Sequence, residues 1–381
     1  MENPQHVLSQ ETSRLEIGRK TSWAVTFVFL FLLVVPVLWK QVGTFVQSFI
    51  QRKLLEIAVE GNEDVLVGYD GWLFDQTEVH ALTGFGPLRV RGFNATRNPQ
   101  HTKATPIRES ILQFAAELKA QGINFLLVPV PTKPMLYGEY VNPNASYTWI
   151  THPDASTFYA ELREQGIDVL DLTSDLASLR TKRKHIFVRV PDRKDKEAIA
   201  EAEEDAKKLH DVFHQQSSFL TPEAMRLAAE RVSDHLQKAY PFSEKYAIRA
   251  VDGVSRSEFG NLVSQLKLAS PETFFDPENV FLRVIGDGTE SADSPLVLLG
   301  GDLLRIYDDP ELGYANPENP EAKIHAGFAQ HLSLLLQHPL DVVPQSGIDT
   351  EAILQKLNRD EWRDKKLVVW LVSARDLFLN P

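Results

Sequence analysis

The chain contains no cysteine, and its 40 Lys and Arg residues are outnumbered by 52 Asp and Glu, which gives a formal net charge of -12. The absence of cysteine excludes disulfides, thiolate zinc sites and a cysteine nucleophile, although it identifies no compartment. The deficit of basic residues argues against a nucleic-acid surface, because binding to phosphate backbones takes clustered Lys and Arg. Internal repeats and low-complexity tracts are also missing. The 381 residues, 43% of them hydrophobic, are enough for one large or two ordinary domains with a sizeable core.

One long uncharged run, residues 21–39, stands near the N-terminus. As a helix it spans about 29 Å, which matches the hydrocarbon core of a bilayer. A cleaved signal peptide is the rival interpretation. Against it, the run exceeds the usual apolar region of a signal peptide, a polar tail of residues 1–20 precedes it, and no small-x-small cleavage site follows. We therefore expect an uncleaved transmembrane anchor, continued by a juxtamembrane helix over residues 40–60.

Positive charges beside this run indicate its orientation. Arg19 and Lys20 lie directly before the run, and Lys40 follows it. The positive residues nearest the membrane favour a cytoplasmic N-terminus. We predict a single-pass protein of the inner membrane whose main domain, residues 61–381, lies in the periplasm.

The pattern from residue 105 onward is typical of an α/β protein. Helical apolar spacing over residues 107–118 is followed by a buried strand at 125–130, and a second helix-strand unit covers residues 158–172. Repeated strand-helix-strand order implies parallel pairing and a doubly wound sheet flanked by helices. The charged stretch 189–210 is predicted to be a solvent-facing insertion. Residues 246–281 are predicted to form a long connection with one short helix around 261–268.

The four apolar residues Leu296–Leu299 predict a strand that is buried on both faces and stops at Gly300-Gly301-Asp302. Open α/β sheets place their chemistry at the carboxyl ends of strands, so this turn is the first place to look for a nucleophile. The turn resembles the Gly-Asp-Ser turn of SGNH-type esterases and acyltransferases, but Leu303 stands at the position of the serine. Asp302 itself fits a structural turn residue.

Two further motifs make the resemblance specific. Residues 68–74 read G-x-D-G-W-L-F, and residues 129–137 read P-x-P-x-K-x-x-x-Y. Both resemble the AlgX/AlgJ-type SGNH hydrolase-like domain of proteins that O-acetylate alginate and similar exopolysaccharides, and the resemblance covers residues 61–378. It implies an SGNH-like fold, no cofactor and no metal, and substrate-binding residues at Gly301, Asp302, Lys133 and Tyr137. Because lysines are mostly exposed, we expect the Lys133 amine to be solvated rather than catalytic.

The family's Asp-x-His-Trp-Thr-Pro-Glu box has a counterpart that ends in Thr221-Pro222-Glu223. On this register Ser217 replaces the Asp and Phe219 replaces the His. A triad needs a hydroxyl, a base that deprotonates it and an acid that orients the base, so no catalytic residue of the family is intact here. A substitute set remains conceivable, consisting of Asp211, His214, Ser217 and Ser218. A His210/His214 metal site is weaker, since a third ligand is missing.

The sequence thus favours a membrane-anchored periplasmic protein of exopolysaccharide O-acetylation. We expect a catalytically degenerate, acetyltransferase-like subunit that binds polysaccharide or other envelope acetylation and export proteins. One alternative is an active O-acetyltransferase that uses non-standard residues. Another is a structural envelope protein that reuses the fold, which would have a filled cleft.

Overall fold

The computed structural model describes residues 64–84, 86–88, 107–142, 149–184, 211–241, 244–314, 319, 322–345 and 362–379. The predicted tail (1–20), membrane span (21–39), juxtamembrane helix (40–60) and charged insertion (189–210) lie outside these residues. Within the described ranges, no helix combines the length and the apolar character that crossing a bilayer requires.

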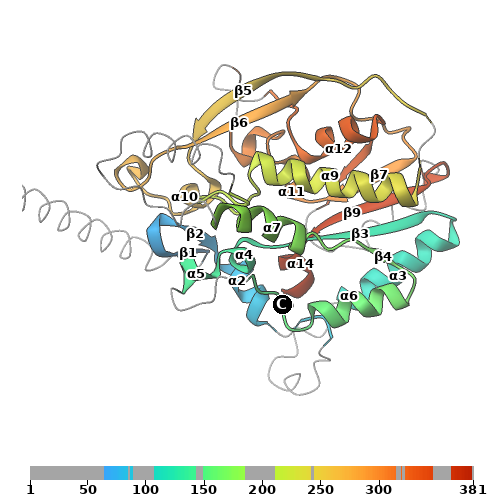
Figure 1. Cartoon of the computed structure of the whole chain (residues 1–381), viewed down its shortest axis with the longest axis horizontal. Helices are drawn as coiled ribbons and strands as arrows, with labels where there is room; N and C mark the ends of the chain where they lie inside the picture. Colours follow the sequence, from blue (N-terminus) through green and yellow to red (C-terminus); the bar gives the residue numbers. More distant parts are fainter. Residues whose placement is uncertain are drawn as a thin grey trace, which may run out of the picture. The chain divides into compact units, whose positions relative to one another are not determined.

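Five parallel strands of the described chain form one sheet in the order β4-β3-β9-β7-β8 (Figure 1). These strands are β3 (Asn124–Val130), β4 (Asp168–Val169), β7 (Leu296–Gly300), β8 (Asp341–Pro344) and β9 (Leu367–Ser373). The last strand in sequence, β9, occupies the centre, where Trp370 pairs with Leu127 on one side and Leu299 on the other. In the helix-strand unit predicted over residues 158–172, the strand, β4, is only two residues long.

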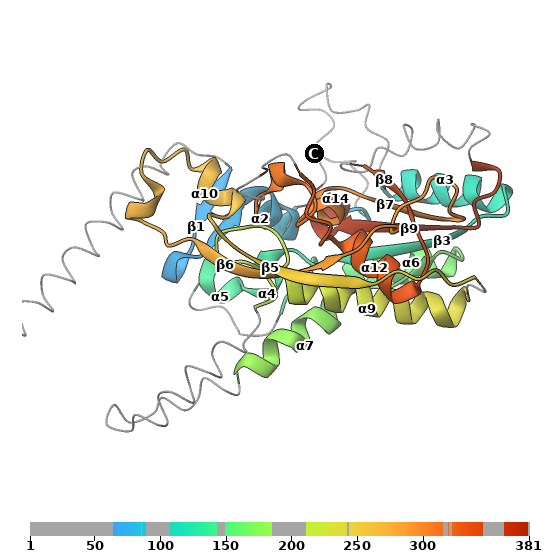
Figure 2. The same ribbon diagram turned by 90° about the horizontal axis from the view of Figure 1, so that it is seen from above.

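Alternate residues of the strands face two separate apolar layers. Leu126, Leu298 and Val369 belong to one layer, whereas their neighbours Leu127 and Leu299 belong to the other. The first layer is covered by α7 (Thr173–Lys184), α9 (Pro222–Ala239) and α12 (Phe328–Leu336), and the second by α3 (Ile107–Ala120), α6 (Ala155–Glu164) and α14 (Ala374–Phe378). Figure 2 shows α9 and α3 on opposite sides of the sheet. The predicted parallel sheet flanked by helices is confirmed.

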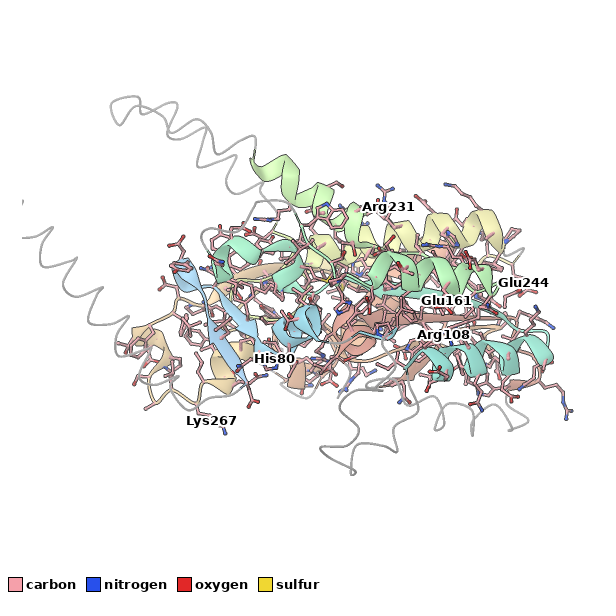
Figure 3. All side chains as sticks on the ribbon, turned by 90° about the horizontal axis from the view of Figure 1, so that it is seen from below. His80, Arg108, Glu161, Arg231, Glu244 and Lys267 are labelled. Atoms are coloured by element: carbon pink, nitrogen blue, oxygen red, sulfur yellow. The ribbon has the colours of Figure 1, made fainter. Side chains whose placement is uncertain are left out.

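Local residues determine where two of the helices begin and end. Thr221 caps α9 by accepting a hydrogen bond from the Ala224 N–H at 3.4 Å, and Pro222 occupies the first helical position. After α3, Gly122 takes a positive φ of 77° that few other residues adopt, so the chain turns directly into β3. Helices α3 and α6 lie side by side, and Arg108 Nε donates to Glu161 Oε1 at 2.9 Å (Figure 3).

The chain's described part opens with a hairpin of β1 (Val65–Val67) and β2 (Leu73–Asp75), joined by the 3-10 turn η1 (Tyr69–Gly71). The hairpin leads into α2 (Gln76–Thr83). Gly68 is needed here because a Cβ would stand 2.5 Å from the carbonyl oxygen of Tyr140. Trp72 stacks on Tyr137 and Tyr140 at centroid distances of 4.4 and 4.6 Å. Tyr137 lies between the short helices α4 (Lys133–Leu136) and α5 (Gly138–Val141), and Tyr140 belongs to α5.

The prediction of a long connection over residues 246–281 is wrong in one respect. This region contributes to a second antiparallel pair of strands. β5 (Ala250–Glu258) and β6 (Glu278–Ile285) pair along most of their length, and between them lie α10 (Asn261–Gln265) and η3 (Pro271–Thr273). Exposed residues alternate with buried ones along β6, and the polar Asn279 and Arg283 limit its apolar run to residues 280–282. The sequence signal was therefore the weak, alternating one of a half-buried strand.

Candidate functional site

A pocket of about 160 Å³ lies at the carboxyl edge of the sheet. Pro131 follows β3, Gly301 follows β7, Gln345 follows β8, and Ser373 ends β9, so four strands deliver residues to one opening. The other lining residues come from the hairpin, α2, the 211–220 loop, α10, the short helix α11 (Asp302–Arg305), β9 and α14: Asp75, Glu78, Phe213, Ser218, Phe219, Asn261, Gln265, Asp302, Leu303, Trp370, Leu371, Val372, Arg375 and Asp376.

The turn after β7 brings Gly301, Asp302 and Leu303 to the pocket. Gly300 permits this turn, because a Cβ there would lie 2.8 Å from the Leu304 side chain and 2.9 Å from the Leu371 carbonyl oxygen. Asp302 begins the short helix α11 (Asp302–Arg305), is exposed, and lies 3.8 Å from Arg305. The family that this turn resembles has a serine at this position. Here the pocket is lined instead by the hydrocarbon side chain of Leu303.

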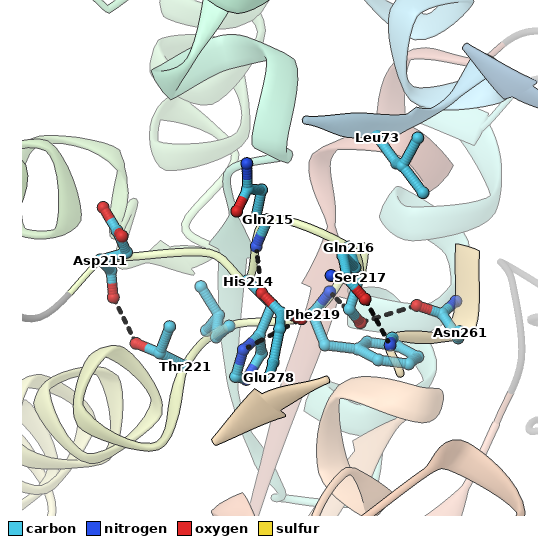
Figure 4. Close-up of polar contacts among 12 residues, drawn as sticks. Leu73, Asp211, His214, Gln215, Gln216, Ser217, Phe219, Thr221, Asn261 and Glu278 are labelled. Carbon is cyan, nitrogen blue, oxygen red and sulfur yellow. Dashed lines mark hydrogen bonds and ion pairs between the residues drawn. The ribbon is translucent and has the colours of Figure 1, made fainter. Parts of the chain in front are cut away.

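The loop over residues 211–220 forms the opposite wall. Ser217 Oγ donates to Asn261 Oδ1 at 2.6 Å and accepts a hydrogen bond from the Phe219 N–H at 3.2 Å (Figure 4). These bonds hold the buried Phe219 ring at the pocket. Ser218 also lines the pocket, and its buried hydroxyl has no hydrogen-bond partner among the described residues.

His214 is buried away from this pocket in a cluster of tyrosines. Because Tyr307 donates its single hydroxyl proton to the Leu220 carbonyl at 2.8 Å, His214 Nε2 is the donor in its hydrogen bond to the Tyr307 oxygen. Its Nδ1 lies 3.7 Å from Glu278 Oε2. Burial, followed by the nearby positive charge of Lys133, lowers the pKa of His214 to about 3. The imidazole is therefore neutral across the physiological range.

The substitute set of Asp211, His214, Ser217 and Ser218 does not converge on one point. Asp211 accepts a hydrogen bond from the Tyr137 hydroxyl at 3.4 Å, and Figure 4 shows it beside Thr221, while Ser217 lies beside Asn261. Of the four residues, Ser218 alone belongs to the pocket lining. His210 lies outside the described residues, and within them no three His, Asp or Glu side chains gather in a metal-binding arrangement.

The expectation that Lys133 is solvated is wrong, since the side chain is fully buried. Its amine donates to the carbonyl oxygens of Leu73, Gln215 and Ser217, the last two at 2.7 and 3.1 Å. The amine also lies 5.1 Å from the ring centre of Trp72. Burial lowers the pKa of Lys133 to about 7, against the opposing effect of nearby carboxyls. Carbonyls and a ring thus replace the water that an exposed lysine would have.

Lys133 and Tyr137, expected to bind substrate, instead connect the hairpin to the 211–220 loop. Tyr137 is buried, stacks on Trp72, and accepts a hydrogen bond from the Val212 N–H at 2.9 Å. Neither residue lines the pocket. Gly301 and Asp302, the other two expected binding residues, do line it.

A polar wall that the sequence analysis did not single out is formed around Glu78. This carboxyl is buried, and burial followed by repulsion from Asp75 raises its pKa to about 8, although Arg375 and Lys133 oppose the shift. Asp75 caps α2 through the Thr77 N–H, and Arg375 bridges Asp75 at 3.5 Å and Asp376 at 3.0 Å. The sequence does carry a signal, since an acid at the N-cap and Glu three residues later is typical of a helix start. That signal predicts a cap, however, and not a pocket.

Comparisons with known proteins find one matching family model and several similar solved structures. Residues 65–194 match the family described as SGNH hydrolase-like domain, acetyltransferase AlgX. The O-acetyltransferase domain of Pseudomonas putida AlgJ superposes with a TM-score of 0.53 at 18% identity, over 83% of this chain and 92% of that one. AlgX of Pseudomonas aeruginosa gives 0.47 at 17% identity, over 81% of this chain and 61% of that one. PatB1 of Bacillus cereus gives 0.39 at 10% identity, over 82% and 95%.

The likeness to AlgJ establishes the fold, and the family match establishes the sequence relationship of the N-terminal part of the domain. No curated protein matches the chain. Residues 65–194 thus resemble the SGNH hydrolase-like AlgX family in sequence, and the chain shares its fold with the AlgJ O-acetyltransferase domain.

Proposed function

We propose that this chain is a catalytically degenerate, acetyltransferase-like protein of exopolysaccharide O-acetylation that binds glycan in the pocket at the carboxyl edge of its sheet. The match of residues 65–194 to the family described as acetyltransferase AlgX supports a role in exopolysaccharide O-acetylation. The observation that carries the proposal is the pairing of Leu303 and Phe219 in one pocket. These are the positions at which the resemblance places the serine and the histidine.

Acyl transfer through a covalent intermediate needs a hydroxyl and a base that accepts its proton. Leu303 offers no hydroxyl, and the Phe219 ring accepts no proton. Ser217, at the position of the acid, uses its hydroxyl to hold Phe219 and Asn261 in place. The pocket has kept its place in the fold while its lining has lost the atoms that form an acyl-enzyme, so binding is the function that it can still perform.

The two alternatives differ in what they require of this pocket. A structural envelope protein would have a filled cleft, whereas the described residues enclose about 160 Å³ with carboxylates and amides in the wall. An active acetyltransferase on non-standard residues would need a hydroxyl in the pocket. Ser218 is the observation in its favour, because this hydroxyl lines the pocket without a partner.

Hydrolysis of a chromogenic acetyl ester by the full chain tests the loss of catalysis. We expect the purified chain to hydrolyse p-nitrophenyl acetate no faster than a heat-denatured sample, and Ser218→Ala to leave that rate unchanged. A variant with Leu303→Ser, Ser217→Asp and Phe219→His is the reference for a restored triad. Hydrolysis by the unmodified chain that Ser218→Ala abolishes would refute the degenerate site and establish the alternative enzyme.

The membrane anchor and the periplasmic domain are part of the same proposal. They are supported by the uncharged run at residues 21–39 and by the positive residues directly before it. An anchor at the inner membrane would hold the pocket beside polysaccharide in transit and beside other acetylation and export proteins.

A further inference from the structure

The charged groups of the pocket are predominantly acidic. Asp75, Asp302 and Asp376 line it, and the basic residue among its described lining is Arg375. Each of the three aspartates contributes a formal negative charge. The Arg375 guanidinium already faces Asp75 at 3.5 Å and Asp376 at 3.0 Å, so its charge is balanced within the protein. Arg305, outside the described lining, faces Asp302 at 3.8 Å and is also paired with Asp309. A carboxylate on a ligand would therefore meet a wall of net negative charge whose neighbouring arginines already face aspartates.

Glu78 adds a second, independent feature that points to a ligand. Only 4% of its surface is exposed, it lines the pocket, and its Oε2 atom has no hydrogen-bond partner in the described part of the chain. Burial raises its pKa to about 8, so at pH 6 it is a neutral acid that can donate a hydrogen bond. A neutral donor of this kind suits the hydroxyl groups of a sugar. A buried polar atom that a ligand satisfies is an ordinary feature of a binding site.

We propose that this pocket takes a sugar unit without a carboxylate, and that a free amino group on the sugar strengthens binding. The inference rests on the proposed glycan-binding function and narrows its ligand to uncharged or cationic sugars, excluding uronates. An ammonium group has three donors and a positive charge, which matches an acidic wall. The net charge of -12 on the whole chain acts in the same direction, because it repels a polyanionic glycan before contact.

Three tetrasaccharides with the same β-1,4-linked gluco backbone test the ligand's charge: oligomers of glucose, glucosamine and glucuronate. Calorimetric titration of the full chain at pH 6, in a polyoxyethylene detergent that carries no sugar headgroup, compares their dissociation constants. We expect glucosamine to bind most tightly, glucose next and glucuronate least. Binding in which glucuronate equals or exceeds glucose would overturn the charge inference while leaving glycan binding intact. Binding of none of the three would refute the proposed function together with the inference.

Asp302→Asn tests whether the pocket carboxylates cause the preference. We expect it to reduce the preference for glucosamine over glucose by about two- to fivefold, the effect of one partly solvated charge. Asp234→Asn on α9 is a matched control, because Asp234 also lies 3.8 Å from an arginine three residues away and does not line the pocket. It should leave the preference unchanged. Equal effects of the two substitutions, or no effect of Asp302→Asn, would contradict the assignment.

Discussion

At the scale of single residues, Lys133 shows how a charged side chain supports this fold from within. Its amine lies at the junction of the hairpin and the 211–220 loop, where it donates to Leu73, Gln215 and Ser217. An ammonium group is stable in such a place only because main-chain oxygens take the place of water. The same loop holds Ser218 and Phe219 at the pocket, so Lys133 positions the pocket wall without touching it.

Lys133→Met should therefore destabilise the protein strongly. Methionine fills much of the volume but leaves three buried carbonyls without their donor, and we expect a loss of about 3 kcal/mol in the free energy of unfolding. Urea denaturation at pH 7 measures it. Lys366→Met, at an exposed lysine just before β9, is the control and should change stability by less than about 0.5 kcal/mol. Similar midpoints for both variants would show that the Lys133 amine contributes little.

The burial of Lys133 could not be predicted from the sequence, and the reason is physical. Its three acceptors are carbonyls at positions 73, 215 and 217, which periodicity does not connect with residue 133. By contrast, the turn after β7 was predictable, because four apolar residues followed by two glycines determine it locally. Local sequence patterns thus predicted one wall of the pocket. The other wall depends on long-range contacts, which no local pattern predicts.

At the scale of elements, the start of α2 places two acidic residues in different environments within one turn. Asp75 stands at the N-cap, where it accepts the Thr77 N–H at 2.8 Å, whereas Glu78 is turned into the interior. Helix α14 packs beside α2 and contributes Arg375, which faces Asp75 at 3.5 Å. The two short helices together make the polar wall of the pocket.

Glu78 should make stability depend on pH. Below pH 4.5 the carboxyl is protonated in both the folded and the unfolded chain. Between pH 4.5 and about 8 the unfolded chain loses the proton while the folded chain keeps it, so folding becomes less favourable as the pH rises. Relative to Glu78→Gln, the wild type should lose about 3 kcal/mol of unfolding free energy from pH 4.5 to pH 7.

Urea denaturation of both proteins at several pH values measures this difference. Subtracting the two profiles removes the contributions of Lys133, Asp75 and Arg375 to the pH dependence of stability, because the two proteins share these residues. Glu117→Gln on the exposed side of α3 is the matched control and should keep the wild-type profile. Parallel profiles for wild type and Glu78→Gln would mean that the folded carboxyl is ionised.

The elements themselves were largely predictable, and their arrangement was not. Helical apolar spacing predicted α3 and the helix-strand unit that contains α6, because this signal acts within a few residues. The position of β9 between β3 and β7 depends on which apolar faces meet after the whole chain has collapsed. The β5–β6 pair was missed since polar residues limit the apolar runs of both strands to three residues or fewer.

At the scale of the whole molecule, an acidic domain with an N-terminal apolar run has two regions of opposite character. The domain carries a pocket at one edge of its sheet, and the run at residues 21–39 matches the thickness of a bilayer. If the run is an anchor with a cytoplasmic N-terminus, the pocket faces the periplasm. The proposed glycan binding would then take place on the side of the membrane where exopolysaccharide is exported.

The absence of cysteine makes this topology directly measurable. Ser9→Cys marks the tail, and Glu244→Cys marks an exposed position of the domain (Figure 3). A maleimide that does not cross membranes, applied to cells with a permeabilised outer membrane, should label Glu244→Cys and reach Ser9→Cys only after lysis. Labelling of Ser9→Cys alone would invert the proposed orientation. Labelling of neither before lysis would place the domain in the cytoplasm, and labelling of both would remove the membrane span, because no segment would then separate the two positions.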